Sequence, residues 1–219
     1  MSTRTALQEE LARLRYDILG MATRVEENLA KAMTALKNQD LNLAKEAKAG
    51  DKEVDRLQLA IEDAAAVLIA TQQPVARDLR ELVTIFKVTY NLERAGDYSV
   101  HLAKTAIKLA GEAPFRQIGR LDRMAGVGLR MIRGAVSAYQ NWDVETARST
   151  ALLDDEIDHE HKALIEEILS LMKDHPELIK RASKLLTTSG YLERFGDHMT
   201  NVCEAVVYMV EGRHLELND

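Results

Sequence analysis

The sequence predicts an all-α fold, a tandem duplication of an antiparallel three-helix bundle with six long helices. Long stretches repeat their apolar residues with the period of an α-helix and are bounded by helix start and stop residues. β-Branched alternation with hairpin turns is absent, and only 5% of the 219 residues are aromatic, which argues against a sheet. Two short acidic motifs each occur twice in the same order, which indicates the duplication.

Helix boundaries are marked by prolines, caps and glycines. Each of the three prolines stands where a helix is expected to begin, because the first helical turn tolerates a residue without an N–H group. Asp40 and Asp143 are expected N-caps, and Gly111 and Gly212 are expected C-terminal stops. The predicted helices cover residues 5–37, 41–72, 75–110, 115–140, 144–173 and 177–211.

The internal repeat rests on two motifs. Leu92-Glu93-Arg94-Ala95-Gly96-Asp97 returns as Leu192-Glu193-Arg194-Phe195-Gly196-Asp197, and Asp51-Lys52-Glu53-Val54-Asp55 returns as Asp154-Asp155-Glu156-Ile157-Asp158. The second copy follows at an offset of 103 residues for the Asp-rich motif and 100 residues for the other. We therefore expect one three-helix unit from residue 1 to 111 and a second from 112 to 219.

Each motif carries two carboxylates four residues apart, which are neighbours on one face of a helix. Like charges at this spacing repel by roughly 0.2–0.5 kcal/mol when exposed and by far more when buried. A chain that builds four such pairs is expected to bind something positive at them. The candidate metal ligands are Asp51, Asp55, Glu93, Asp97, Asp154, Asp158, Glu193 and Asp197.

The apolar stripes indicate where these carboxylates point. Val75, Leu79, Leu82 and Phe86 define an arc of the third helix, and Glu93 and Asp97 are expected in the middle of it; Glu193 and Asp197 likewise continue the stripe of Ile179, Ala182 and Leu186. Asp51 with Asp55, and Asp154 with Asp158, fall at the flank of their own stripes. If the two helices of each half run antiparallel, four carboxylates converge.

Four ionised carboxylates in a partly buried site need protons, arginines or metal ions to balance them. Oxygen ligands suit hard or borderline cations such as Mg, Mn, Ca or Fe, and several carboxylates can bridge more than one ion. Gly96 and Gly196 between the ligands allow the facing backbone to approach closely. Ion pairs with Arg94 and Arg194 are the competing interpretation.

Several other polar residues lie near these motifs. His101 and Asn201 each lie four residues beyond the last acid and are candidates for a further ligand. Glu156-x-x-His159 imitates the Glu-x-x-His motif of di-iron bundles, but it points away from the apolar arc of its helix and Arg56 replaces the histidine in the first half, which favours coincidence.

Composition excludes several classes. With 35 acidic and 29 basic residues the net charge is -6, which argues against a nucleic-acid binder. Cys203 is the only cysteine, so an intramolecular disulfide and a Cys-based zinc site are excluded and a reducing cytoplasm is expected. Met1 to Tyr16 does not resemble a secretion signal, and the longest apolar run, Ala64 to Ala70, is too short to cross a bilayer. We expect membrane association only through partner proteins.

Two further segments complete a recognisable pattern. They are the turn Gln72-Gln73-Pro74-Val75-Ala76-x-Asp78-Leu79-Arg80 and the closing Tyr208-x-x-Glu211-Gly212. Together with the duplicated motifs, they make nearly the whole chain resemble the PhoU family of phosphate-uptake regulators. The chain departs from the family pattern at His101, where Asn is frequent, and at Ala95 and Phe195, where Ile is frequent.

The resemblance implies a pair of cytoplasmic three-helix bundles whose Glu/Asp-x-x-x-Asp motifs bind metal ions, with iron, manganese or magnesium as candidates and multinuclear clusters in some members. It also implies a protein without enzymatic activity that represses the phosphate-starvation response. Its implied partners are the ATPase component of the phosphate ABC transporter, a membrane sensor histidine kinase and further copies of itself, as in a homodimer. The alternatives are a di-metal carboxylate enzyme, which would need an open coordination position, and a metal-free helical adaptor.

Overall fold

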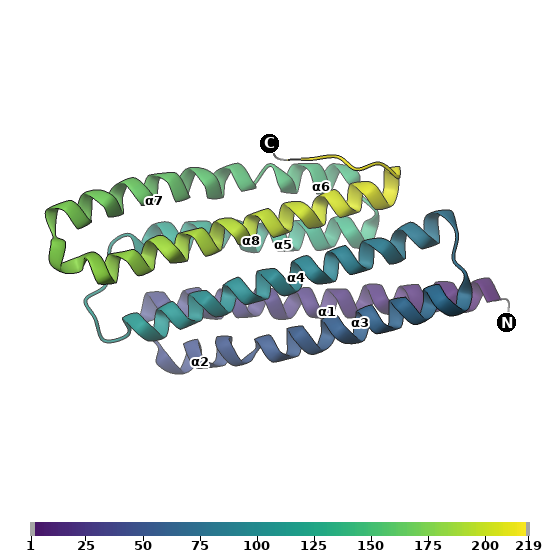
Figure 1. Cartoon of the computed structure of the whole chain (residues 1–219), viewed down its shortest axis with the longest axis horizontal. Coiled ribbons are helices and arrows are strands. Elements are labelled where there is room, and N and C mark those ends of the chain that lie inside the picture. Colours follow the sequence, from purple (N-terminus) through teal and green to yellow (C-terminus); the bar gives the residue numbers. More distant parts are fainter. Residues whose placement is uncertain (1–2, 218–219) are drawn as a thin grey trace.

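Figure 1 shows the computed structural model, which describes residues 3–217. The helices are α1 (Thr3–Asn38), α2 (Leu41–Ala49), α3 (Asp51–Gln72), α4 (Ala76–Leu109), α5 (Ile118–Asn141), α6 (Val144–Ala151), α7 (Asp154–Asp174) and α8 (Ile179–Glu211), with a short 3₁₀ turn η1 (Pro176–Leu178) before the last. No strand occurs among these residues. The all-α prediction is therefore confirmed, while the predicted outer limits at residues 1 and 219 lie outside the described residues.

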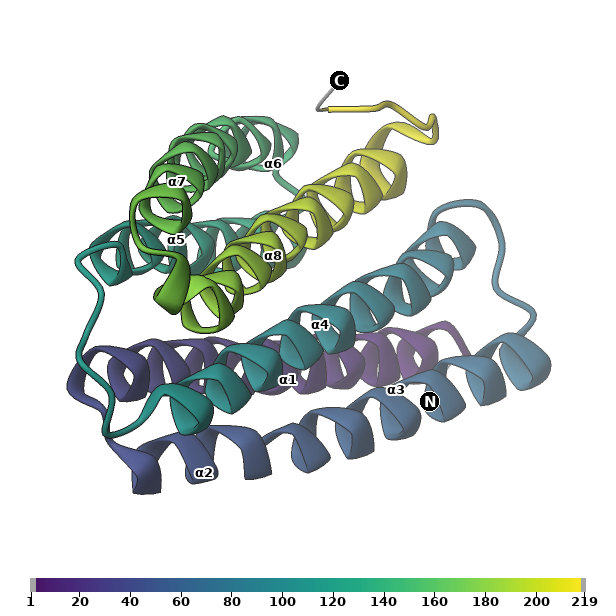
Figure 2. The same ribbon diagram turned by 60° about the vertical axis from the view of Figure 1, so that its left-hand side comes forward.

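The helices form two similar sets, one from each half of the chain. The first set consists of α1 to α4 and the second of α5 to α8, and Figure 2 shows one above the other. Within each set, two short consecutive helices (α2 and α3, or α6 and α7) together take the place of one long helix (Figure 1). The result is a duplicated three-helix bundle, as the sequence predicts.

The two sets meet mainly along α4 and α8, which run antiparallel. The rings of Tyr98 and Tyr191 stack across this interface with centroids 5.9 Å apart. Thr188 Oγ1 donates a hydrogen bond to Thr105 Oγ1 at 3.1 Å in the buried part of the interface. Both contacts join helices from different halves, so the interface fixes the register of one repeat on the other.

Two of the six predicted helices are each divided in two. The predicted helix 41–72 breaks at Gly50, and the predicted helix 144–173 breaks at Leu152 and Leu153. A Cβ atom at Gly50 would meet the side chain of Asn28 on α1, so the missing side chain allows this close approach. Both breaks fall immediately before the Asp-rich motif and therefore place its first acid, Asp51 or Asp154, in the first turn of a new helix.

The predicted N-caps and the predicted stop at Gly212 are confirmed, whereas α4 is capped by Ala110, one residue before the predicted stop at Gly111. Asp40 Oδ1 accepts hydrogen bonds from the backbone N–H groups of Asn42 and Leu43 at 2.9 and 3.0 Å, and Asp143 Oδ1 accepts one from Thr146 at 3.1 Å. Gly212 ends α8 with a φ of 73°, a left-handed conformation that glycine adopts without strain. The three prolines each precede a helix by one to four residues or lie in its leading 3₁₀ turn.

The predicted apolar stripe of α4 is partly wrong. Leu82 is fully buried, but Val75 and Leu79 are 72% and 38% exposed. α4 packs against α1, α3 and α8, so its buried arc is broad and is centred on Leu92, Ala95 and neighbouring residues. Val75 precedes the first residue of α4, and Leu79 lies outside that arc. In α8, Ile179 is likewise 48% exposed.

No helix of the described chain is both long and apolar enough to span a membrane.

The packing of Phe195 generates a stability prediction. Its ring is fully buried and lies against Gly128 of α5, where an added Cβ would be 3.1 Å from the ring. Phe195→Ala should lower the free energy of unfolding by about 3–5 kcal/mol, because a large buried side chain is lost and a cavity remains. Urea unfolding followed by circular dichroism measures this change. Tyr16→Ala, at a 74% exposed position, is the control and should change stability little; equal losses in the two variants would contradict the assigned core.

Candidate metal centres

The first acidic site joins the start of α3 to the middle of α4. Asp51 and Asp55 come from α3, and Glu93 and Asp97 come from α4. The negative charges of Asp55 and Asp97 act on Asp51, and those of Asp97, Asp55 and Asp51 act on Glu93. The structure therefore brings all four predicted residues of the first half together.

Burial and mutual repulsion shift the protonation of this site. Desolvation, followed by the charges of Asp55 and Asp97, raises the pKa of Asp51 to about 6. Desolvation and the charge of Asp97 raise the pKa of Glu93 to about 7, although Arg94 opposes the shift. Near neutral pH, the site therefore holds its negative charges at a cost that a bound cation would offset.

One carboxylate oxygen of the first site lacks a partner. Asp51 Oδ1 is buried and makes no hydrogen bond among the described residues. It faces Gly96 of α4, where an added Cβ would lie 3.4 Å away. A buried acceptor without a donor is costly, and an all-oxygen donor set beside it has the chemistry of a hard or borderline cation site. The donor atoms of the first site thus suit a metal ion in their chemistry.

The second acidic site is a hollow between α7 and α8 with a volume of about 370 Å³. It is lined by Asp154, Asp155, Asp158, Glu193, Asp197, Thr200, Asn201 and Glu204. Asp154 is only 3% exposed. Burial and the neighbouring carboxylates, Asp158 in both cases, raise the pKa values of Glu193 and Asp197. The four predicted residues of the second half are therefore also brought together.

Each site has a glycine between its ligand candidates, but only the second site requires it. An added Cβ at Gly196 would collide with Asp154 Oδ1, whereas one at Gly96 would lie 3.4 Å from Asp51 Oδ1, an ordinary van der Waals contact. The absent side chain at Gly196 thus lets Asp154 lie directly on the backbone of α8. The sequence prediction of a close approach agrees with the structure at Gly196.

The depth of the carboxylates differs from the prediction. Glu93 and Asp97 were expected in the middle of the apolar arc, but they lie at its edge and are half-buried, and Asp197 is exposed. Asp154, expected at a flank, is the most buried of the eight. The helix breaks before α3 and α7 turn the first acid of each Asp-rich motif inward, which the periodicity of one continuous helix does not anticipate.

Positive side chains already pair with some of these acids. Arg94 Nη1 donates to Asp97 Oδ2 at 2.6 Å, and Lys162 Nζ lies 3.3 Å from Asp158 Oδ2. The predicted pair between arginine and acid is therefore present in the first half, whereas Arg194 forms no ion pair with another described residue. Across residues 3–217, no three His, Cys, Asp or Glu side chains are gathered tightly enough to hold a metal ion. Binding would require these side chains to rotate within the site.

The remaining candidates for a metal ligand lie in different places in the structure. The ring of His101 stacks on Tyr191 at 4.5 Å in the interface between the repeats, whereas Asn201 lines the second hollow. Glu156 forms an ion pair with Arg130, so the Glu156-x-x-His159 motif does not face either site.

Sequence reasoning missed three lining residues of the second site. They are Asp155, Thr200 and Glu204. The spacing along α8 could have indicated Thr200 and Glu204. Polar residues recur there every three or four positions on one helix face, at Glu193, Asp197, Thr200 or Asn201, and Glu204.

Relatives with known names match this chain over nearly its whole length. The PhoU domain matches residues 18–106 and 121–206. A phosphate-specific transport system accessory protein PhoU homolog of Clostridium acetobutylicum is 34% identical over 99% of this chain and 100% of its own length. The Escherichia coli (strain K12) phosphate-specific transport system accessory protein PhoU is 30% identical over 93% of this chain and 85% of its own.

Solved structures agree with this match. The crystal structure of PhoU from Pseudomonas aeruginosa superposes with a TM-score of 0.90 at 31% identity, covering 94% of this chain and 99% of that one. The phosphate transport system regulatory protein PhoU from Streptococcus pneumoniae gives a TM-score of 0.89 at 32% identity, with coverage of 95% and 99%.

The fold is that of a duplicated helical protein with paired acidic sites, and the relatives that match it are named as accessory or regulatory proteins of phosphate transport, not as enzymes. The chain belongs to the PhoU family, whose members serve as accessory or regulatory proteins of phosphate transport. The predicted family and the predicted lack of enzymatic activity are confirmed.

The raised pKa of Glu93 generates a pH prediction for the metal-free protein. The pKa of Glu93 is about 7 in the folded state against an ordinary value of 4.5 for a glutamate, so the folded state holds an extra proton between these two pH values. The stability contributed by this proton is therefore present below about pH 4.5 and lost as the pH rises through about 7. Relative to wild type, Glu93→Gln should gain stability across this window and keep the gain at pH 8.

The measurement is urea unfolding in the presence of a chelator at several pH values. Glu166→Gln, at an exposed position of α7, serves as the matched control and should show no such window. A difference between Glu93→Gln and wild type that stays constant with pH would contradict the shifted carboxyl group.

Proposed function

We propose that this protein is a metal-binding cytoplasmic regulator of phosphate transport and phosphate-starvation signalling. In this proposal it acts as a negative regulator between the ATPase component of the phosphate ABC transporter and a sensor histidine kinase. Membership of a family of transport accessory proteins supports the phosphate connection. The duplicated carboxylate sites support the metal.

The observation that carries the metal proposal is the buried Asp51 Oδ1 without a hydrogen-bond donor, pressed against Gly96 and repelled by Asp55 and Asp97. A cation would neutralise the repulsion and satisfy this oxygen at once. The proposed ligands are Asp51, Asp55, Glu93 and Asp97 in the first half and Asp154, Asp158, Glu193 and Asp197 in the second. Such oxygen ligands suit iron, manganese or magnesium, with carboxylates able to bridge several ions.

The names of the relatives support the proposed binding partners. A phosphate-specific transport system accessory protein must meet that transport system, and a chain without a membrane-spanning helix among its described residues would do so through a protein subunit. The ATPase component is the proposed contact because it is the part of an ABC transporter that faces the cytoplasm. Self-association, as in a homodimer, belongs to the same proposal.

A metal-free helical adaptor is the second candidate. The ion pair between Arg94 and Asp97 favours it, because an arginine already neutralises one acid of the first site. This pair is about one-third exposed on both sides and is worth about 0–1 kcal/mol. A cation held by several carboxylates can outcompete such a pair.

Removing two ligands tests the metal proposal. Glu93→Ala combined with Asp97→Ala should abolish metal binding in the first half and leave the second half loaded, because the second site shares no residue with it. Metal content per chain, measured by mass spectrometry of the purified protein, should fall. The far-ultraviolet circular dichroism should stay the same, since both residues are half-buried at most. An unchanged metal content would refute the ligand assignment.

Deleting the gene tests the regulatory role. The deletion strain should express its phosphate-starvation genes in phosphate-rich medium, because the repressing component is missing. Transcript levels of the phosphate transporter operon are the readout, and reintroduction of the wild-type gene should restore repression. Normal repression without the gene would rule out a negative regulatory role.

A further inference from the structure

The two acidic sites are not equivalent, and two charge reversals separate them. At the offsets that align the repeats, Lys52 in the first half corresponds to Asp155 in the second, and Lys104 corresponds to Glu204. Asp155 and Glu204 both line the second hollow. Two positions beside the duplicated motifs thus carry opposite charges in the two halves, although Lys162 also pairs with Asp158 at the second site.

Glu204 is held in place at the second site. Its Oε1 accepts a hydrogen bond from the backbone N–H of Leu217 at 3.0 Å, so the segment after α8 fixes the carboxylate. Glu204 lies seven residues, two helical turns, beyond Asp197 and on the same face of α8. A fixed carboxylate at this place adds a negative charge and an oxygen ligand to the four acids of the motif.

Thr200 is a second, independent sign of a ligand in the hollow. It is 5% exposed and lines the hollow, and its Oγ1 is buried without a hydrogen-bond partner among the described residues. A buried hydroxyl without a partner costs free energy unless a ligand or water satisfies it. The corresponding residue of the first half is Val100, which carries no oxygen in its side chain.

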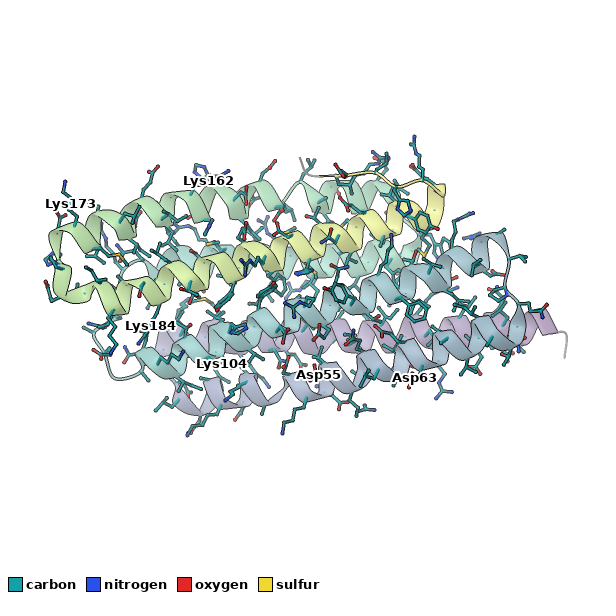
Figure 3. The ribbon with its side chains drawn as sticks, in the orientation of Figure 1. Asp55, Asp63, Lys104, Lys162, Lys173 and Lys184 are labelled. Carbon is teal, nitrogen blue, oxygen red and sulfur yellow. The ribbon has the colours of Figure 1, made fainter. Side chains whose placement is uncertain are left out.

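Lys104 has the opposite effect on the first site. Its positive charge acts on Asp51 and favours the ionised carboxylate there. Figure 3 labels Lys104 on α4 and Asp55 on α3, the two helices that build the first site. Lys104 forms no ion pair within the described chain, so its charge is not cancelled by a specific partner. A positive ammonium group that acts on Asp51 also repels a cation entering the first site.

We propose that Glu204 and Thr200 are additional ligands of the second site and make it the tighter of the two sites for multiply charged cations. This inference rests on the proposed metal-binding function. The first site, with Lys104 in the place of Glu204, is the weaker site and loads at a higher metal concentration. The two halves of one duplicated protein then report on two ranges of cation concentration.

Titration of the chelator-treated full-length protein with Mn²⁺ tests the proposal, with calorimetry for affinity and electron paramagnetic resonance for the number of bound ions. Glu93→Gln with Asp97→Asn leaves only the second site, and Glu193→Gln with Asp197→Asn leaves only the first. At low salt, the second site alone should bind Mn²⁺ about tenfold more tightly than the first site alone.

Exchanging the two charges should reverse this order. Glu204→Lys, placed in the protein with only the second site, should weaken binding by about tenfold, and Lys104→Glu in the protein with only the first site should tighten it by a similar factor. Thr200→Val, which keeps the shape and the charge, should weaken only the second site. The resonance spectrum of the bound Mn²⁺ should also change with Thr200→Val if the hydroxyl is a direct ligand.

Matched charge reversals far from the sites serve as controls. Glu166→Lys on α7 and Arg13→Glu on α1 are exposed, unpaired positions of the described structure and should change the affinities less than about twofold. Equal affinities of the two sites, a tighter first site, or indifference to Glu204→Lys and Thr200→Val would overturn the proposal while leaving metal binding intact. The absence of Mn²⁺ binding at both sites would overturn the proposed metal-binding function as well.

Discussion

The contact between a carboxylate and the backbone of a glycine organises both halves of this protein. Asp51 lies on Gly96 and Asp154 lies on Gly196, in each case with a further acid on either side of the glycine in sequence. This contact partly desolvates the carboxylate next to like charges. Such desolvation destabilises the folded state unless something else compensates it. A helical protein that needed only a stable core would have no reason to repeat such an arrangement.

The helix breaks before α3 and α7 make these contacts possible and reduce their cost. They restart the helix at Asp51 and at Asp154, so the first acid of each Asp-rich motif lies in a first turn. The free N–H groups and the positive end of the helix dipole favour negative charge there. The breaks have different local causes, since the first uses Gly50 against Asn28 and the second contains no glycine. Both breaks nevertheless fall at the same place in the two repeats. The place of the break is therefore shared by the two halves, whereas the residues that form it are not.

Much of the fold could be predicted from the sequence because its signals are local. The caps at Asp40 and Asp143 and the terminating Gly212 act within one helical turn. The duplicated motifs indicate the internal duplication directly. The breaks at Gly50 and Leu152 could not be predicted, because they depend on side chains from other helices such as Asn28. Likewise, Leu79 and Glu93 share an arc of α4 whose exposure is decided by where α3 and α8 pack. The convergence of the acids was predictable from their spacing, whereas the ion pair of Asp97 with Arg94 depends on a rotamer.

The interface between the repeats places the first site in contact with the second half of the chain. Arg94, which pairs with Asp97, also lies over the ring of Tyr98 at 5.7 Å, and Tyr98 stacks on both Tyr191 and His198 of α8. His198 directly follows Asp197 of the second site. A cation that competes with Arg94 for Asp97 therefore acts on a side chain packed against the interface. The aromatic contacts between α4 and α8 thus connect Arg94, the ion-pair partner of Asp97, with His198, the residue next to Asp197.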